Sequence, residues 1–366
     1  MNIPDSFSHS YATARVKFLE AAASAGARIQ SYPHPLPGFE GEALAMDVVL
    51  DGSPDAEKLL IVSSACHGVE GYCGSGVQVH ALHDPTWRAQ AAARGVAVLY
   101  IHALNPYGFS HIRRVTHENV DINRNFQDFS SPLPVKPAYR ELHALLLPEA
   151  WPPGPENQAA LDAHIARVGM KAFQAAVTSG QHEFPDGLFF GGTGPTWSNV
   201  TLRQVLRDYG GRASRVAWID IHTGLGPSAV GERICACRDE PVALARARAW
   251  WGSDGSTPVT SIYDGSSTSA LLTGLMWNSV YTECPQAEYT GIALEYGTYP
   301  MERMIAAMRA EQWLQLHPQA DGVMARRIKQ DMLDMFYVDT DAWKARIVDQ
   351  ARTTLAQAVQ GLCGLS

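Results

Sequence analysis

Two short motifs, far apart in the chain, carry side chains that could bind a metal ion. His67-Gly68-Val69-Glu70 follows the apolar run 59–62, and Asp220-Ile221-His222 ends another apolar run far downstream. Two imidazoles and one carboxylate, with a fourth position left to water, form an open zinc site. A His and a Glu three residues apart can converge on one ion from a tight loop, and a His from a neighbouring strand can complete the set. We therefore predict one zinc ion (Zn²⁺) per chain, bound by His67, Glu70 and His222.

The His-x-x-Glu motif alone is weak, because a chain with 13 His residues can contain it in an ordinary polar loop. Further motifs follow it in an ordered series, namely Asn105-Pro106-Tyr107-Gly108, Arg113-Arg114, Asp121-Ile122-Asn123-Arg124-Asn125, Asp220-Ile221-His222 and Leu294-Glu295-Tyr296-Gly297. In this order the series resembles the zinc carboxypeptidase A-like superfamily, of the carboxypeptidase, aspartoacylase and succinylglutamate desuccinylase type. The resemblance is greatest to an uncharacterised bacterial branch of that superfamily, and it covers about residues 58–300.

The resemblance implies roles for the reacting groups. Glu295 matches the catalytic Glu, which would take a proton from the attacking water and pass it to the departing nitrogen. The Arg before the Asp-x-Asn-Arg string matches the residue that polarises the substrate carbonyl, a role that suits a permanently charged guanidinium. Arg113 and Arg114 both fit this position. We choose Arg114 and expect its neighbour to be an ion-paired or surface residue.

The resemblance also implies how the substrate and the first ligand are held. Asn123 and Arg124 match the pair that holds a free carboxylate, which suits a bidentate guanidinium beside an amide donor. Asp121 matches the residue that orients the first His ligand, here His67, and its alternative role is that of a turn-forming Asp. Tyr263 is the match for a mobile Tyr over the substrate, but its separation from Glu295 is longer than usual, and a core aromatic is the alternative.

The elements that must position these residues alternate between strands and helices. Apolar runs rich in β-formers each end in a motif residue, at 59–63, 96–102, 216–221 and 292–296. Ligands of α/β sheets bind at the carboxyl ends of the strands, where these motifs fall. Helical patterns are predicted at 158–177, 301–316, 325–336 and 341–359, the last two packing on the sheet. The glycine-rich segment 187–194 is predicted to be either a turn or a rim of the cleft.

These patterns predict a single α/β domain over residues 1–366, with a twisted mixed β-sheet flanked by helices, as the resemblance to the zinc carboxypeptidases implies. Its motif-bearing core spans about 58–300, and C-terminal helices follow at about 301–359. The chain has 366 residues, 46% of them hydrophobic, which suffices for a large core.

Composition restricts the partners and the compartment. A net charge of −8 argues against a nucleic-acid or anionic-membrane partner. No run approaches the roughly 20 apolar residues of a membrane span, and no secretory signal is visible. The six Cys are sparse and form no disulfide-scaffold pattern. We expect a cytoplasmic protein, and the sequence leaves its oligomeric state open.

Together these features favour a zinc-dependent hydrolase of an amide bond next to a free carboxylate. It would be either a metallocarboxypeptidase or an N-acyl amino acid deacylase, acting on a small peptide or an N-acyl amino acid. The alternative is a catalytically silent zinc-fold protein that binds peptides or acyl amino acids. Glu295 argues against it, because a binding protein has no use for a base at this place. A serine hydrolase is disfavoured because the chain contains no Gly-x-Ser-x-Gly.

Overall fold

One mixed β-sheet organises the chain. The computed structural model describes residues 1–252 and 257–364. Within these residues the strands are β1 (Arg28–Pro37), β2 (Ala43–Asp51), β3 (Lys58–Ser63), β4 (Val96–His102), β5 (Arg215–Gly224), β6 (Gly231–Cys235), β7 (Val259–Thr260) and β8 (Glu288–Gly297). Their order across the sheet is β1-β2-β4-β3-β5-β8-β6-β7.

The four central strands, β4, β3, β5 and β8, run parallel to one another. They are buried along nearly their whole length, which explains their near-continuous apolar sequences. These are the four strands predicted from the sequence, although β5 and β8 extend further than expected. The antiparallel flanking strands β1, β2 and β6 were not predicted. β1 contains Pro33, Pro35 and Pro37, and it lies at the edge of the sheet, where a proline without an N–H on the outer side leaves no partner unsatisfied.

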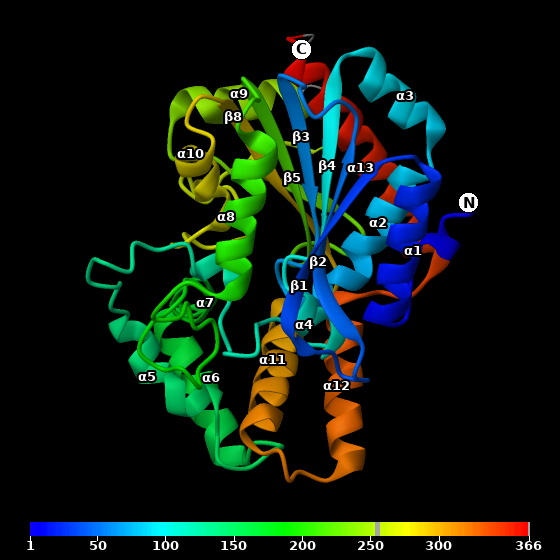
Figure 1. Cartoon of the computed structure of the whole chain (residues 1–366). Coiled ribbons are helices and arrows are strands. Elements are labelled where there is room, and N and C mark those ends of the chain that lie inside the picture. The colour runs from blue at the N-terminus through cyan, green and yellow to red at the C-terminus, as the bar shows by residue number, and fades with distance from the viewer. Residues whose placement is uncertain (253–256, 365–366) are drawn as a thin grey trace.

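Helices cover both faces of the sheet. Those of the described residues are α1 (Tyr11–Ser24), α2 (Gly71–Leu82), α3 (Pro85–Ala93), α4 (Pro106–Ser110), α5 (Pro137–Leu146), α6 (Pro155–Val168), α7 (Met170–Thr178), α8 (Trp197–Gly210), α9 (Pro241–Trp251), α10 (Val280–Glu283), α11 (Met301–Leu316), α12 (Gly322–Phe336) and α13 (Asp341–Leu362), with the short 3₁₀ helices η1 (Pro4–Ser6), η2 (Gly68–Glu70), η3 (Ile122–Arg124) and η4 (Met276–Ser279). Helices α2, α9 and α13 pack against the central strands, while α8 lies in front of the sheet in Figure 1.

The predicted helices are largely confirmed, with one correction. The pattern at 158–177 is two helices, α6 and α7, because Gly169 between them has φ +84° and ψ 152°, a conformation that an α-helix cannot contain. α11 has the predicted bounds, α12 begins three residues earlier, and α13 ends three residues later. α13 packs on β3 and β5 as expected, whereas α12 pairs mainly with α11.

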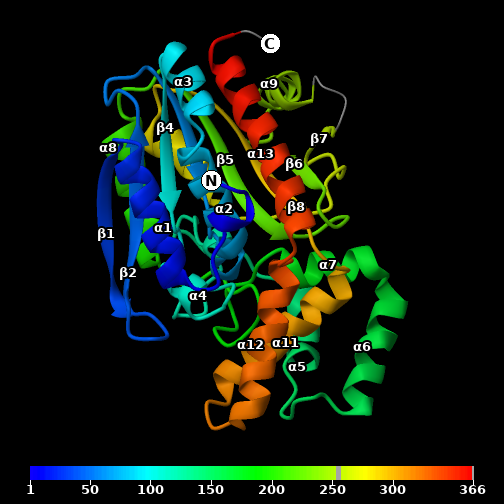
Figure 2. The ribbon, with the colours of Figure 1, turned by 90° about the vertical axis from the view of Figure 1, so that its right-hand side faces the viewer.

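The carboxyl ends of the parallel strands point toward a group of helices outside the sheet. In Figure 2 the arrowheads of β4 and β5 point down toward α11 and α12, with α5, α6 and α7 beside them. One continuous hydrophobic core runs from Phe7 to Leu362 through the sheet and its covering helices, and a small separate cluster around Trp313 and Ile328 lies within the α11–α12 hairpin. The loops between the sheet and these helices hold the motif residues.

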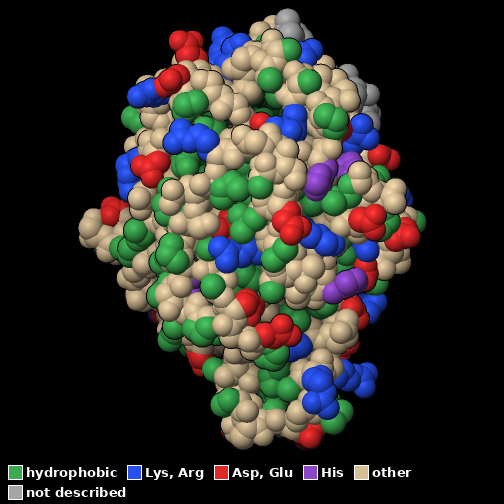
Figure 3. All heavy atoms as spheres, turned by 45° about the vertical axis from the view of Figure 1, so that its right-hand side comes forward, with side chains coloured by type: hydrophobic (Ala, Val, Ile, Leu, Met, Phe, Trp, Pro, Cys, Tyr) green, Lys and Arg blue, Asp and Glu red, His purple; other side chains and the backbone are tan. Residues whose placement is uncertain are grey.

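The surface and the helices give little sign of a particular partner. On the face in Figure 3, Lys and Arg side chains are interspersed with Asp and Glu, so that the described residues gather no broad basic area there. None of the helices in the described ranges is both long and apolar enough to cross a membrane. All six cysteines are free thiols.

Candidate active site

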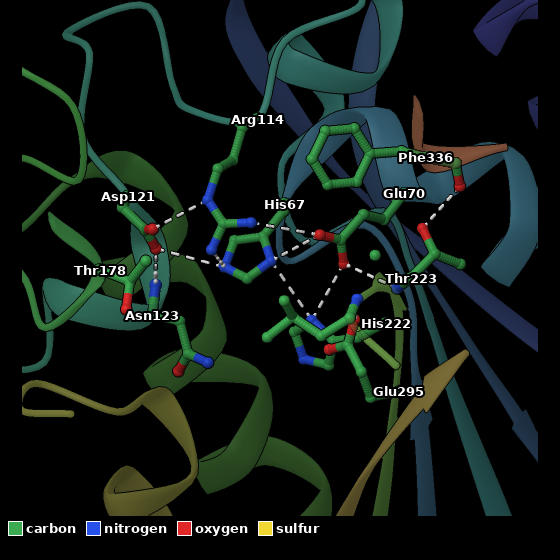
Figure 4. Close-up of polar contacts among 12 residues, drawn as sticks. His67, Glu70, Arg114, Asp121, Asn123, Thr178, His222, Thr223, Glu295 and Phe336 are labelled. Carbon is green, nitrogen blue, oxygen red and sulfur yellow. Dashed lines mark hydrogen bonds and ion pairs between the residues drawn. The ribbon is translucent and has the colours of Figure 1, made fainter. Parts of the chain in front are cut away.

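The three predicted metal ligands meet at the carboxyl ends of β3 and β5. His67 Nδ1 lies 2.9 Å from Glu70 Oε1, and His222 Nδ1 lies 3.0 Å from Glu70 Oε2. The two Nδ1 atoms are 3.3 Å apart. His67, Glu70 and His222 are only 5%, 1% and 3% exposed, and Figure 4 shows their side chains pointing toward one point. Their ring nitrogens and carboxylate oxygens therefore form one compact donor set.

This donor set fits a zinc ion. The Nε2 atoms of both imidazoles face carboxylates, Asp220 for His222 and Asp121, at 3.3 Å, for His67. A proton on each Nε2 leaves lone pairs at both Nδ1 atoms, which then face the acceptor oxygens of Glu70 without a hydrogen between them. A cation bound between these atoms would relieve the repulsion within such a buried cluster of lone pairs. Tetrahedral zinc with bonds of about 2.0–2.1 Å separates its ligand atoms by about 3.3 Å.

Arg114 and Asp121 both contact Nε2 of the His67 ring. Arg114 Nη2 lies 2.7 Å from His67 Nε2, the nitrogen that also faces Asp121. One tautomer cannot satisfy both neighbours, because Arg114 needs a lone pair there and Asp121 needs a proton. A cation bound at His67 Nδ1 requires the proton on Nε2. Metal binding at this site is therefore compatible only with the contact to Asp121, the orienting role predicted for that residue.

The turn that carries His67 and Glu70 is built on the Arg113-Arg114 segment. Gly68 N donates to Arg114 O at 3.0 Å, and Val69 N donates to Arg113 O at 2.8 Å. A Cβ on Gly68 would lie 2.1 Å from the backbone carbon of Gly108, so only Gly allows this approach. The His-x-x-Glu turn and the Arg113-Arg114 segment are separate in the sequence, but backbone hydrogen bonds join them in the structure.

Electrostatics favours an ionised Glu70 and Asp121. Burial acts to raise the pKa of Glu70, but the imidazoles of His67 and His222 outweigh it and lower the pKa to about 2. Burial likewise opposes ionisation of Asp121, yet Arg114, whose Nε donates to Asp121 at 3.1 Å, keeps the pKa of that carboxyl well below its usual range. Both carboxylates are available as anions at neutral pH.

Asp220 is a residue of the site whose role the sequence did not reveal. Its carboxylate contacts His222 Nε2 and accepts a hydrogen bond of 2.5 Å from Ser63 Oγ. The sequence feature that could have indicated this contact is the Asp-x-His spacing, because the side chains of residues i and i+2 of a strand lie on the same face. Cys66 lies close to Asp220 and His222, but burial raises the pKa of its thiol well above the usual value, and His222 Nε2 is already engaged. We interpret Cys66 as a buried neighbour of the site.

The two adjacent arginines point to different places. Arg114 Nη1 lies 3.3 Å from Glu70 Oε1, and its guanidinium lies 5.0 Å from the centre of the Phe189 ring, so Arg114 faces the ligand cluster. Arg113 Nε instead donates to Glu311 of α11 at 3.0 Å. Lys329 of α12 donates to the same Glu311 oxygen at 2.6 Å. Arg113 therefore belongs to a buried ion-pair network that connects the α11–α12 hairpin to the turn that carries His67 and Glu70.

Removing the centre of this network should destabilise the fold. Glu311 is 3% exposed, and Glu311→Ala would leave the Arg113 and Lys329 cations buried without an anion. Loss of one partner of a buried ion pair costs about 3–5 kcal/mol, and we expect the free energy of unfolding in urea to fall by about this amount. The control is Glu302→Ala, an exposed carboxylate on the same helix, which should change stability by less than about 0.5 kcal/mol. Equal effects of the two substitutions would contradict this role of Glu311.

Glu295 lies beside the ligand cluster on the neighbouring strand. In the β5–β8 register it is the partner of His222, and its Oε1 accepts from Leu225 N at 3.0 Å. Burial and the nearby Glu70 carboxylate raise the pKa of Glu295 to about 8, and His222 acts in the opposite direction. A carboxylate with a raised pKa in a cleft is typical of a group that exchanges protons.

Asn123 and Arg124 face the same cleft as the ligands. The cleft encloses about 690 Å³, open solvent included, and both residues line it together with His67, Glu70, Arg114 and Glu295. Asn123 Oδ1 accepts from Met276 N at 3.0 Å, which fixes the amide. Arg124 donates to Thr178 O from Nε at 3.1 Å and from Nη2 at 2.6 Å, and Nη1 donates to Asn123 O at 2.9 Å. Three of the five guanidinium N–H groups are thus used, and two are left for a ligand.

The structure does not bring Tyr263 into this cleft. Its neighbour Ile262 lines the cavity, as do Ser269 and Ala270 of the same segment, but Tyr263 is not among the lining residues. The sequence had not indicated the parts of the wall contributed by Trp277, Met304 and Met308, whereas Phe189 also lines the cleft. Phe189 belongs to the glycine-rich segment 187–194, so the segment borders the cleft. Trp277, Met304 and Met308 carry no motif.

Comparison with solved structures gives the fold class. The structure of thrombin-activatable fibrinolysis inhibitor aligns with a TM-score of 0.54 at 11% identity, covering 98% of this chain and 75% of that one. The bovine inhibitor in complex with tick carboxypeptidase inhibitor gives 0.51 at 10% identity, covering 98% of both chains. Carboxypeptidase A from Helicoverpa armigera gives 0.47 at 12% identity, covering 94% and 73%. The first two alignments show a carboxypeptidase-like α/β fold, as the sequence resemblance implied.

The family can be stated more closely. A family profile described as "Protein of unknown function (DUF2817)" matches residues 7–350, and the chain belongs to this family. No curated protein matches the sequence.

Proposed function

We propose that this protein is a zinc-dependent hydrolase that cleaves an amide bond next to a free carboxylate. One observation carries the proposal. Three side chains whose donor atoms could hold a metal ion, a partly accessible carboxylate with a raised pKa and two arginines all line a single cleft. A binding protein would need the arginines, but it would have no use for Glu295 beside the ligands.

Each side chain has a defined task in this reaction. His67, Glu70 and His222 would hold a zinc ion, which would supply Lewis acidity for the activation of water. Glu295 removes a proton from the attacking water and returns it to the leaving nitrogen as the C–N bond breaks. Arg114 donates hydrogen bonds to the carbonyl oxygen as negative charge develops on it.

Asn123 and Arg124 orient the substrate. The amide of Asn123 and the two free N–H groups of Arg124 donate to the carboxylate of the substrate. This contact fixes the distance between the carboxylate and the scissile bond, so that the protein cleaves next to a chain end or next to an acylated amino acid. The products are a carboxylic acid and a free amino acid.

Metal analysis tests the ligand assignment. We expect about one zinc per chain in the purified protein. His222→Ala should empty the site, because two remaining ligands hold zinc poorly, and elemental analysis after dialysis measures the loss. His80→Ala is the matched control, because His80 lies on α2 away from the ligand cluster. Full zinc occupancy in the His222→Ala protein would show that the assignment is wrong.

Activity requires a separate test. The zinc-loaded protein is incubated with N-acyl amino acids and short peptides, each with a free and with an amidated carboxyl end. Hydrolysis that depends on the free carboxylate supports the proposal. Binding of these compounds without any hydrolysis would instead favour a silent binding protein with a zinc-hydrolase fold.

A further inference from the structure

One aromatic ring contacts both arginines of the cleft. The centre of the Phe189 ring lies 5.0 Å from the guanidinium carbon of Arg114 and 5.7 Å from that of Arg124. Phe189 is 4% exposed, and all three side chains line the cleft. Both distances are within the roughly 6 Å at which a cation is attracted to the face of an aromatic ring. Phe189 therefore contacts both the arginine that would bind the carbonyl oxygen and the arginine that would bind the carboxylate.

The backbone at Phe189 has a conformation that a phenylalanine rarely adopts. Its φ is +53°, in the left-handed region, where the Cβ atom of any residue other than Gly lies too close to the following carbonyl oxygen. A bulky residue stays in this region only where its surroundings impose it. Here Phe189 O accepts from Gln181 N at 3.1 Å, and Phe190 O accepts from Asp121 N at 2.7 Å. The fold thus holds the ring against the two arginines although this strains the backbone locally.

The two guanidinium groups carry like charges in a largely buried place. Burial lowers the pKa of Arg124, Asp121 opposes this, and the like charge of Arg114 lowers the pKa further. Arg114 donates to the Asp121 carboxylate, whereas Arg124 donates to the neutral backbone carbonyls of Thr178 and Asn123. The negative face of the Phe189 ring offsets part of the repulsion between the two cations. Without the ring, we expect the guanidinium groups to move apart.

We propose that Phe189 fixes the separation of Arg114 and Arg124 and thereby selects substrates by the distance between their scissile carbonyl and their carboxylate. This inference rests on the proposed function, in which Arg114 binds the carbonyl oxygen and Arg124 the carboxylate. Amides of α-amino acids, the substrates of that function, have one carbon between the amide nitrogen and the carboxylate, and amides of β-amino acids have two. A displacement of about 1 Å at a reacting centre can cost about 100-fold in rate. Two cations at a fixed separation therefore discriminate between these classes, and a loosely held pair discriminates less.

Two isomeric ligands test this role by binding, independently of turnover. N-acetyl-alanyl-alanine and N-acetyl-alanyl-β-alanine have the same composition and charge, but the carboxylate of the second lies one methylene further from the scissile amide. Calorimetry on the zinc-loaded Glu295→Gln protein measures the affinity for each. We expect the first isomer to bind about 10-fold more tightly or better. When Phe189→Leu is added, the ratio of the two affinities should fall to about twofold, because the guanidinium groups can then adjust to either isomer.

Matched variants separate positioning from packing. Phe189→Tyr keeps the aromatic face and should retain the original ratio. Phe126→Leu is the control, because the Phe126 ring is also buried, at 8% exposure, and lies 5.2 Å from the Arg203 guanidinium, but it does not line the cleft. It should lower the melting temperature as Phe189→Leu does and leave the ratio unchanged. If Phe189→Leu does not fold, Phe189→Met replaces it. An unchanged ratio in a folded variant without the ring, or an equal loss of affinity for both isomers, would overturn the inference.

The inference and the proposed function can fail separately. Discrimination between the isomers that depends on the ring, without hydrolysis of either by the wild-type protein, would refute the proposed function and support the role of Phe189 in binding. Hydrolysis with the same ratio of kcat/KM for the two isomers in the wild-type and Phe189→Leu proteins would support the hydrolase and refute the role of Phe189. Binding of neither isomer would contradict both.

Discussion

Glu295→Gln is expected to lower kcat of the zinc-loaded protein by about 100-fold or more, with zinc content unchanged. The substitution removes the group that carries a proton from water to the leaving nitrogen, and it removes no metal ligand. The amide of Gln is similar in size and can still accept from Leu225 N, where Glu295 Oε1 now accepts at 3.0 Å. Steady-state kinetics together with metal analysis on the same sample measures both quantities.

The chain offers a matched control for this experiment. Glu232 is the partner of Glu295 across the antiparallel β6–β8 pair and points to the same face of the sheet. It binds Thr260 and Thr268 and does not line the cleft. Glu232→Gln should therefore leave kcat within a few-fold of the wild-type value. Near-normal turnover in Glu295→Gln would mean that another group is the base.

Arg124→Ala is expected to reduce kcat/KM by an amount equivalent to about 2–5 kcal/mol of transition-state stabilisation. Arg124 is 3% exposed, and burial lowers its pKa, the nearby Asp121 opposing this. A hydrogen-bonded pair with a carboxylate in such a partly desolvated place is strong. Amidation of the substrate should cost a similar amount, because it removes the other partner of the same pair.

The two losses should not add. In the Arg124→Ala protein, free and amidated substrates ought to have nearly equal kcat/KM, since each change removes the same interaction. The control is Arg167→Ala, an exposed arginine of α6 paired with Glu141, which should preserve the full preference for the free carboxylate. Additive losses in the double cycle would contradict the claim that Arg124 recognises the carboxylate.

The sequence determined the parts of the site that depend on local spacing and on strand ends. A His and a Glu three residues apart on a turn can converge on one point, and parallel strands end at the same edge of a sheet. These two features, together with the resemblance to the zinc carboxypeptidases that implied the role of Glu295, allowed His67, Glu70, His222 and Glu295 to be grouped before any coordinates were known. The four central strands could be predicted because their near-continuous apolar sequences report burial on both faces.

The tertiary structure decided what depends on contacts between distant segments. Arg113 and Arg114 are chemically alike and adjacent. Partners of Arg113 in the folded protein, among them Glu311 and Gln312, about 200 residues away and each at 3.0 Å, determine which guanidinium faces the cleft. The break at Gly169 requires a positive φ that the helical pattern around it does not reveal. Part of the wall of the cleft is assembled from η4 and α11, and its apolar side chains Trp277, Met304 and Met308 carry no motif. Shape of this kind is a property of packing, which spacing along the chain does not encode.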